Sequence, residues 1–163
     1  LDMTGLQTVE RSDTISLAAL TEEVFCDLDP VADKHQIRLI QTEGDCTVTG
    51  SYILLYRAVY NLVEKAIKYN RPSGSVTVNI HSAESAVLEV TDTGIGISPE
   101  NQEKIFDPFY RVDKSRSRAM GGAGLGLALV SEIARQHNGQ VKVTQSSEKG
   151  STIALILPKS TDY

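Results

Sequence analysis

An aspartate stands at the end of a predicted strand, directly before two glycines. Apolar residues over 86–90 recur at every second position, as in a strand with one buried face, and Asp92 continues that spacing. A carboxylate on a buried face is costly unless a partner donates hydrogen bonds to it, and the exocyclic amine of adenine is such a donor. Gly94 and Gly96 would let the backbone turn and a flat ligand come close. The pattern fits an adenine site or a plain strand exit with an aspartate cap.

Three further glycines, Gly122, Gly124 and Gly126, directly precede a predicted helix. Backbone amides at a helix N-terminus that no side chain covers can hold a phosphate. The segment lacks the Gly-Lys-Ser/Thr ending of a P-loop and does not follow a strand, as a dinucleotide fingerprint should. A phosphate site and the hinge of a flexible lid are therefore both open.

Four basic residues lie in the loop before those glycines: Arg111, Lys114, Arg116 and Arg118. A charge run is usually a solvated surface, but four cations beside a candidate phosphate cradle in an acidic protein favour phosphate contact. Residues 111–123 also lack apolar periodicity, and a long irregular loop in a compact domain is typically a lid or disordered. We expect a lid that is mobile without ligand.

The strongest predicted helix carries Asn61, Lys65 and Lys68 at spacings of four and three, so these side chains share one face. That face is offset from the apolar stripe of the helix. Lys68 could form an exposed ion pair with Glu64, worth about 0.2–0.5 kcal/mol. Tyr69 could be edge packing.

The composition is that of one acidic globular domain. The chain has 163 residues and a formal net charge of −5, which argues against nucleic acid or an anionic membrane as the main partner. Cys26 and Cys46 lack metal-ligand spacing, so free thiols are expected, with one disulfide as the alternative. No apolar run approaches the ~18 residues of a membrane span.

The elements that must position these residues follow from apolar periodicity and turn residues. Predicted helices lie at 17–31, interrupted by a kink or restart at Pro30, and at 51–70, 98–105 and 127–138. Predicted strands lie at 15–17 and, as two short strands around a turn, at 37–39 and 47–49; two hairpins cover 76–92 and 141–157. Few helices separate the strands, so we expect an α/β (α+β) two-layer sandwich: a mixed, mostly antiparallel sheet covered on one face by about three helices.

Four motifs carry a family resemblance. They are Asn-Leu-Val-Glu-Lys-Ala-Ile-Lys-Tyr at 61–69, Asp-Thr-Gly-Ile-Gly at 92–96, Phe-Asp-Pro-Phe at 106–109 and Gly-Ala-Gly-Leu-Gly-Leu at 122–127. In this order they resemble the N, G1, F and G2 boxes of sensor histidine kinases, over roughly residues 17–158. The resemblance implies the Bergerat ATP-binding fold, shared with gyrase B, the Hsp90 chaperones and MutL. Those relatives place a catalytic glutamate where this chain has Asn61.

The resemblance also implies roles for single residues. Asp92 would bind the adenine amine, with Thr152 near it through water. Tyr69 would stack on the base, and Lys68 would reach a phosphate. The adenine pocket would be shaped by Gly94, Gly96 and Ile97, the triphosphate bordered by Gly122, Gly124, Leu125 and Gly126, and the terminal phosphate reached by Arg116 or Arg118.

Two departures from the family pattern stand out. Asn61 matches the first N-box asparagine and is the candidate metal contact, but the second, the family's Mg²⁺ ligand, is Lys65 here. An ammonium donates hydrogen bonds and accepts none, so Mg²⁺ is doubtful as a cofactor beside ATP. The second departure is that His35, His81 and His137 all lack the acidic and proline context of the phosphoacceptor.

The implied function is that of the ATP-binding catalytic domain of a two-component sensor histidine kinase. This domain would cover residues 14–163, after the end of a dimerisation helix and linker at 1–13; Leu1 in place of Met suggests a fragment. It would present the γ-phosphate of ATP to a histidine on its own helical domain, for relay to a response regulator. The full-length protein would be a membrane-anchored bacterial homodimer with this domain in the cytoplasm. The alternative supported by Lys65 is a degenerate nucleotide-binding or docking module.

Overall fold

The structure is a computed structural model that describes residues 13–102, 104–107 and 125–160. The elements are β1 (Asp13–Ser16), α2 (Leu17–His35), β2 (Arg38–Gln41), β3 (Thr47–Gly50), α3 (Tyr52–Lys68), β4 (Ser75–Ser82), β5 (Ala86–Asp92), η1 (Pro99–Asn101), η2 (Lys104–Phe106), α5 (Leu125–Gln136), β6 (Gln140–Ser147) and β7 (Gly150–Leu157). The predicted lid at 111–123 lies outside the described residues, as do residues 1–12. The proposed boundary after residue 13 therefore stays a prediction.

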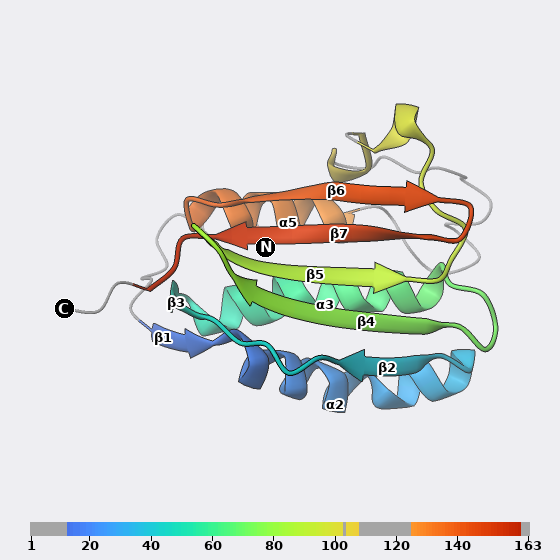
Figure 1. The fold of residues 1–163 in the computed structure, drawn as a ribbon, viewed down its shortest axis with the longest axis horizontal. Helices are drawn as coiled ribbons and strands as arrows, with labels where there is room; N and C mark the ends of the chain where they lie inside the picture. Colours follow the sequence, from blue (N-terminus) through green and yellow to red (C-terminus); the bar gives the residue numbers. More distant parts are fainter. Residues whose placement is uncertain (1–12, 103, 108–124, 161–163) are drawn as a thin grey trace.

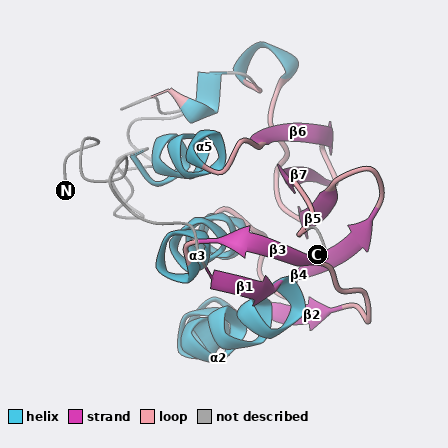
Figure 2. Cartoon of the chain, turned by 90° about the vertical axis from the view of Figure 1, so that its left-hand side faces the viewer, coloured by secondary structure: helices cyan, strands magenta, loops and turns pink. Residues whose placement is uncertain are grey.

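The described strands form a five-stranded sheet in the order β2-β4-β5-β7-β6 and a small pair of β1 with β3. In the large sheet, β2 runs parallel to β4, and the remaining neighbours are antiparallel. The helices α2, α3 and α5 all lie behind this sheet in Figure 1, and Figure 2 shows the two layers from the side. The predicted fold class is confirmed.

One hydrophobic cluster joins the two layers. Leu20 of α2, Leu62 of α3 and Ile133 of α5 are fully buried, as are Leu88 and Leu155 on the two central strands. Burial of such a side chain contributes about 1.5–3 kcal/mol. The predicted hairpins β4–β5 and β6–β7 supply the alternating apolar face that the helices cover.

Helix α3 is fixed at its start by polar contacts. The Ser51 hydroxyl accepts a hydrogen bond from the Leu54 backbone N–H at 3.3 Å, as an N-cap. Further along, the Tyr52 and Tyr56 hydroxyls donate to carboxylates on α2. Burial and the Glu23 carboxylate raise the pKa of Tyr52 to about 12, so this donor stays protonated at neutral pH. These contacts set the position of α3, which carries the candidate polar face.

The N-terminal half differs from prediction in two details. Helix α2 contains Pro30 and does not restart there. Val24, Leu28 and Ala32 are buried on both sides of the proline, and this packing offsets the hydrogen bond that proline cannot donate. In addition, β2 and β3 are strands as predicted but do not pair around their turn. Each pairs with a remote strand instead, which local turn signals do not encode.

The segment after the Asp-x-Gly-x-Gly loop also differs. The sequence predicted one short helix, whereas the chain forms two 3₁₀ turns, η1 and η2. Ser98 makes no side-chain cap with the backbone. Its hydroxyl instead accepts a hydrogen bond from the Asn101 side chain at 2.7 Å. Ser98 therefore does not act as the N-cap that would have favoured a longer helix.

Candidate functional site

Asp92 is the last residue of β5 and lies opposite Ser151 of β7. Its side chain is half-buried. Oδ1 accepts from the Gly94 backbone N–H at 2.8 Å, and Oδ2 accepts from the Ser151 hydroxyl at 2.9 Å. Burial raises the pKa of this carboxyl, and the hydrogen bonds from Gly94 and Ser151 only partly offset that effect. The carboxylate is thus held in a place where a further donor would stabilise its charged form.

The two glycines after Asp92 are required by close contacts. A Cβ at Gly94 would lie 2.5 Å from the Tyr69 carbonyl oxygen. Gly96 has φ of +79°, and a Cβ there would lie 2.0 Å from the Ser147 carbonyl oxygen. The Ile97 backbone N–H donates to a serine hydroxyl on β6 at 2.6 Å. The loop is therefore fitted between the end of α3 and the end of β6.

Thr152 does not lie beside Asp92. Cross-strand neighbours share a face of the sheet, and Thr152 is paired with Thr91, their hydroxyls 2.9 Å apart. Ser151 is the β7 residue whose hydroxyl contacts Asp92 directly, and the sequence analysis did not single it out. Extending the alternating apolar positions of 153–157 back by one step reaches residue 151, which was the available signal.

The polar face of α3 leads to this loop. The Asn61 side-chain amide donates to a backbone carbonyl one turn back at 2.8 Å. Lys68 forms the ion pair with Glu64 that its spacing suggested, at 3.6 Å. Lys65 Nζ lies 6.0 Å from the centre of the Tyr69 ring. Since Tyr69 caps α3 and contacts the glycine loop, this face and Asp92 border the same region.

The structure describes only part of the predicted phosphate-binding segment. Arg116, Arg118, Gly122 and Gly124 lie outside the described residues. Leu125 begins α5, with Gly126 next to it. The phosphate cradle therefore stays a prediction.

Metal and membrane features can be judged only over the described ranges. Within them, no group of three or more His, Cys, Asp or Glu residues could hold a metal ion. None of the described helices combines the length and apolar character needed to span a bilayer. Cys26 and Cys46 are both free thiols, as predicted.

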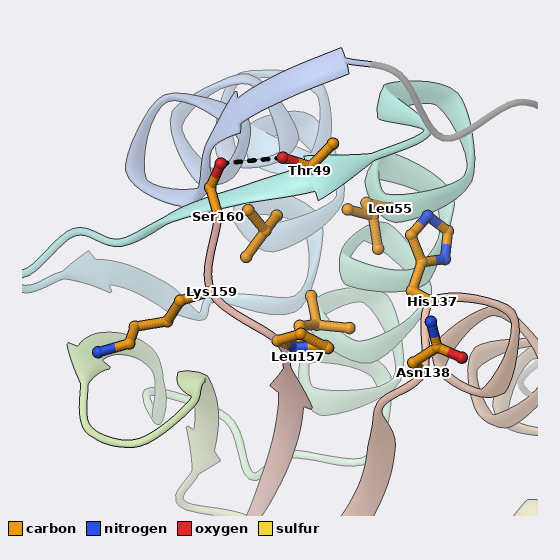
Figure 3. A pocket seen from close by; sticks show the side chains of 9 residues that line it. Thr49, Leu55, His137, Asn138, Leu157, Lys159 and Ser160 are labelled. Atoms are coloured by element: carbon orange, nitrogen blue, oxygen red, sulfur yellow. Dashed lines mark hydrogen bonds between the residues drawn. The ribbon is translucent and has the colours of Figure 1, made fainter. Parts of the chain in front are cut away.

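A separate pocket lies at the far end of β7, beside Leu157 (Figure 3). His137 lines it and is buried. Its Nε2 accepts from the Ser51 backbone N–H at 3.0 Å, and its Nδ1 is 2.8 Å from the Ile133 carbonyl oxygen. A backbone N–H can only donate, so the ring is neutral with its proton on Nδ1. His137 thereby joins the end of α5 to the start of α3 as an uncharged ring.

The chain matches the family described as "Histidine kinase-, DNA gyrase B-, and HSP90-like ATPase" over residues 50–161. The sensor-like histidine kinase SenX3 of Mycolicibacterium smegmatis is 36% identical, over 99% of this chain and 44% of its own length. The sensor histidine kinase RppB of Synechocystis sp. is 43% identical, over 85% of this chain and 30% of its own length. The chain thus spans less than half of these curated relatives.

Solved structures agree with the sequence relatives. The mycobacterial sensor histidine kinase MprB has a TM-score of 0.76 and 28% identity, covering 93% of this chain and 99% of that one. The catalytic domain of the histidine kinase ThkA has the same fold, with a TM-score of 0.76 at 24% identity, over 90% of this chain and 96% of that one.

Proposed function

The chain belongs to the histidine kinase-, DNA gyrase B- and HSP90-like ATPases, as an ATP-binding domain of the sensor histidine kinase type, and from this premise we propose how it works. ATP binds with its adenine amine on Asp92. The domain then presents the γ-phosphate to a histidine on a separate helical domain of the same protein. The observation that carries this proposal is the half-buried Asp92 carboxylate, fixed by Gly94 and Ser151 beside the end of α3.

The other site residues take roles around that contact. Ser151 orients Oδ2 of Asp92, and Tyr69 stacks on the base. Lys68 leaves Glu64 to reach a phosphate. The pocket walls are Gly94, Gly96 and Ile97; the residues proposed to border the triphosphate are Gly122, Gly124, Leu125 and Gly126, and those proposed to reach the terminal phosphate are Arg116 and Arg118.

The chemistry left to this chain is positioning and charge neutralisation. In the transfer, the bond between the γ-phosphorus and the bridging oxygen of ADP breaks as a bond from phosphorus to the acceptor imidazole nitrogen forms. The cationic groups proposed around the triphosphate offset the charge that ADP retains. A response regulator would then take the phosphoryl group. We further propose a homodimeric, membrane-anchored bacterial protein with this domain in the cytoplasm.

Mg²⁺ commonly accompanies ATP in phosphoryl transfer, and when bound it would neutralise phosphate charge. The described residues of the α3 face do not fit it. Asn61 offers one amide oxygen, and the side chain one turn on is Lys65, which has no acceptor atom. Glu64 is already paired with Lys68. The same feature favours, as a second candidate function, a degenerate module that binds nucleotide without efficient transfer.

Ser151→Ala should weaken ATP binding about three- to tenfold, because Asp92 loses the hydroxyl that holds Oδ2. A typical hydrogen bond contributes about 0.5–1.5 kcal/mol. Thr152→Ala is the matched control and should change affinity less than twofold, since Thr152 pairs with Thr91 on the other face. Isothermal titration calorimetry measures both. Equal losses in the two variants would return the role to Thr152.

The proposal as a whole is tested with ATP labelled at the γ-phosphate. The full-length protein should acquire an acid-labile phosphohistidine, and the 163-residue chain alone should stay unlabelled. His137 is buried with both ring nitrogens bonded, which leaves it unable to accept a phosphoryl group. A phosphohistidine at His35, His81 or His137 would overturn the proposed division between the two domains. Failure to label the full-length protein would favour the degenerate module.

A further inference from the structure

Lys65 differs from its neighbour Lys68 in having no ion-pair partner among the described residues, whereas Lys68 lies 3.6 Å from Glu64. The Lys65 side chain is half-buried. Burial lowers the pKa of this ammonium; Glu64 acts in the opposite direction, and Lys68 adds to the lowering. A partly desolvated cation without an ion-pair partner is costly, and an anionic ligand would reduce that cost.

The position of Lys65 indicates what that anion is. Lys65 lies one helical turn after Asn61 and one turn before Tyr69, on the same face of α3. Its Nζ extends toward the Tyr69 ring, 6.0 Å from the centroid. The Tyr69 carbonyl packs on Gly94, whose N–H holds Asp92. The ammonium therefore lies on the side of α3 that borders the proposed nucleotide site.

The donor set there suits phosphate oxygens better than a divalent cation. Mg²⁺ requires several oxygen ligands in octahedral geometry, and an ammonium supplies none. The ammonium can instead contact a phosphate directly as a point charge. Mg²⁺ on the nucleotide would also bring a like charge toward Lys65.

We propose that Lys65 makes this a site for metal-free nucleoside polyphosphate, with its ammonium in direct contact with the phosphates where a divalent cation would otherwise bridge them. This inference rests on the proposed nucleotide site. Its consequence is that Mg²⁺ does not strengthen nucleotide binding by this chain.

The test is calorimetric titration of the chain with ATP in excess Mg²⁺ and in EDTA. Wild type should bind ATP at least as tightly in EDTA as in Mg²⁺. Lys65→Met, which keeps the length of the side chain, should weaken binding in EDTA at least fivefold. Lys34→Met makes the same change at an exposed position of α2 and should leave affinity unchanged.

Lys65→Asn provides the converse measurement. It should make binding at least tenfold tighter in Mg²⁺ than in EDTA, because an amide oxygen then faces Asn61. Wild-type binding that is itself tenfold tighter in Mg²⁺ would overturn the role of Lys65 while leaving the nucleotide site intact. Absence of ATP binding by folded wild type, in either buffer, would overturn the nucleotide site itself. Circular dichroism confirms that each variant is folded.

Discussion

Replacing Asp92 with alanine should weaken ATP binding at least tenfold while the domain stays folded. A hydrogen bond to a charged group contributes about 1.5–3 kcal/mol, and Asp92 is the proposed acceptor of the hydrogen bond from the adenine amine. The fold should survive because Val90 and Leu88 keep β5 in the core. Glu89→Ala is the control, since Glu89 lies on the opposite face and pairs with His81 at 3.4 Å. Unchanged affinity of the alanine variant would remove Asp92 from the site.

The pH dependence follows from the direction of the Asp92 pKa shift. Because burial raises that pKa, the folded domain binds the proton more tightly than the unfolded chain does. Above the pKa of Asp92 in the folded domain, its ionised carboxylate therefore lowers the free energy of unfolding. This loss of stability disappears as the pH falls through that pKa toward ~3.9, the ordinary aspartate pKa. ATP binding has the opposite preference and should weaken over the same fall in pH. Asp92→Asn should lack both pH dependences: that of ATP affinity, measured by calorimetry, and that of stability, measured by thermal melts.

Gly150→Ala should destabilise the domain by about 2 kcal/mol or more and also weaken ATP binding. Gly150 has φ of +138°, and a Cβ there would lie 2.0 Å from the Asp92 carbonyl oxygen. The strain cannot be relieved without moving β7 away from β5, which shifts Ser151 relative to Asp92. The melting temperature should fall by about 5 °C or more.

Lys149→Ala is the matched control for this glycine. Lys149 is exposed in the same turn, and its backbone N–H donates to the Ser147 hydroxyl, a hydrogen bond that alanine keeps. Its melting temperature should stay within about 1 °C of wild type in differential scanning calorimetry. If Gly150→Ala melts as high as this control, the close approach of the two strands does not constrain residue 150.

Much of the fold could be predicted because its signals are local. The hairpins β4–β5 and β6–β7 and the helices α3 and α5 follow from alternation or helical spacing within one short segment. The C-terminal end of α5 was also predictable from the sequence. Asn138 has φ of +60°, a conformation that asparagine tolerates. The parallel pairing of β2 with β4 could not be predicted from local patterns, because α3 lies between the two strands in the sequence and must connect them.

The position of Asp92 at the end of a strand was predictable for the same reason. Asp92 and its glycines form one continuous motif. The choice between Ser151 and Thr152 depends on how β7 aligns with β5, and a shift of one residue exchanges the faces of a strand. The continuity of α2 through Pro30 depends on tertiary packing that outweighs a local propensity.

The contact between Asp92 and Ser151 joins residues 59 positions apart in the chain. Bringing two strands so far apart in the chain together is entropically costly. It is also late in folding, because most of the domain must already be ordered before β5 and β7 meet. A nascent chain that has emerged only as far as β5 holds the aspartate but not its partner, so it has no completed pocket. Nucleotide would then bind only the domain in which β5 and β7 have paired. Because a ligand stabilises the state that it binds, it would favour the completely folded domain. The proposed nucleotide would therefore also favour complete folding over partly folded states.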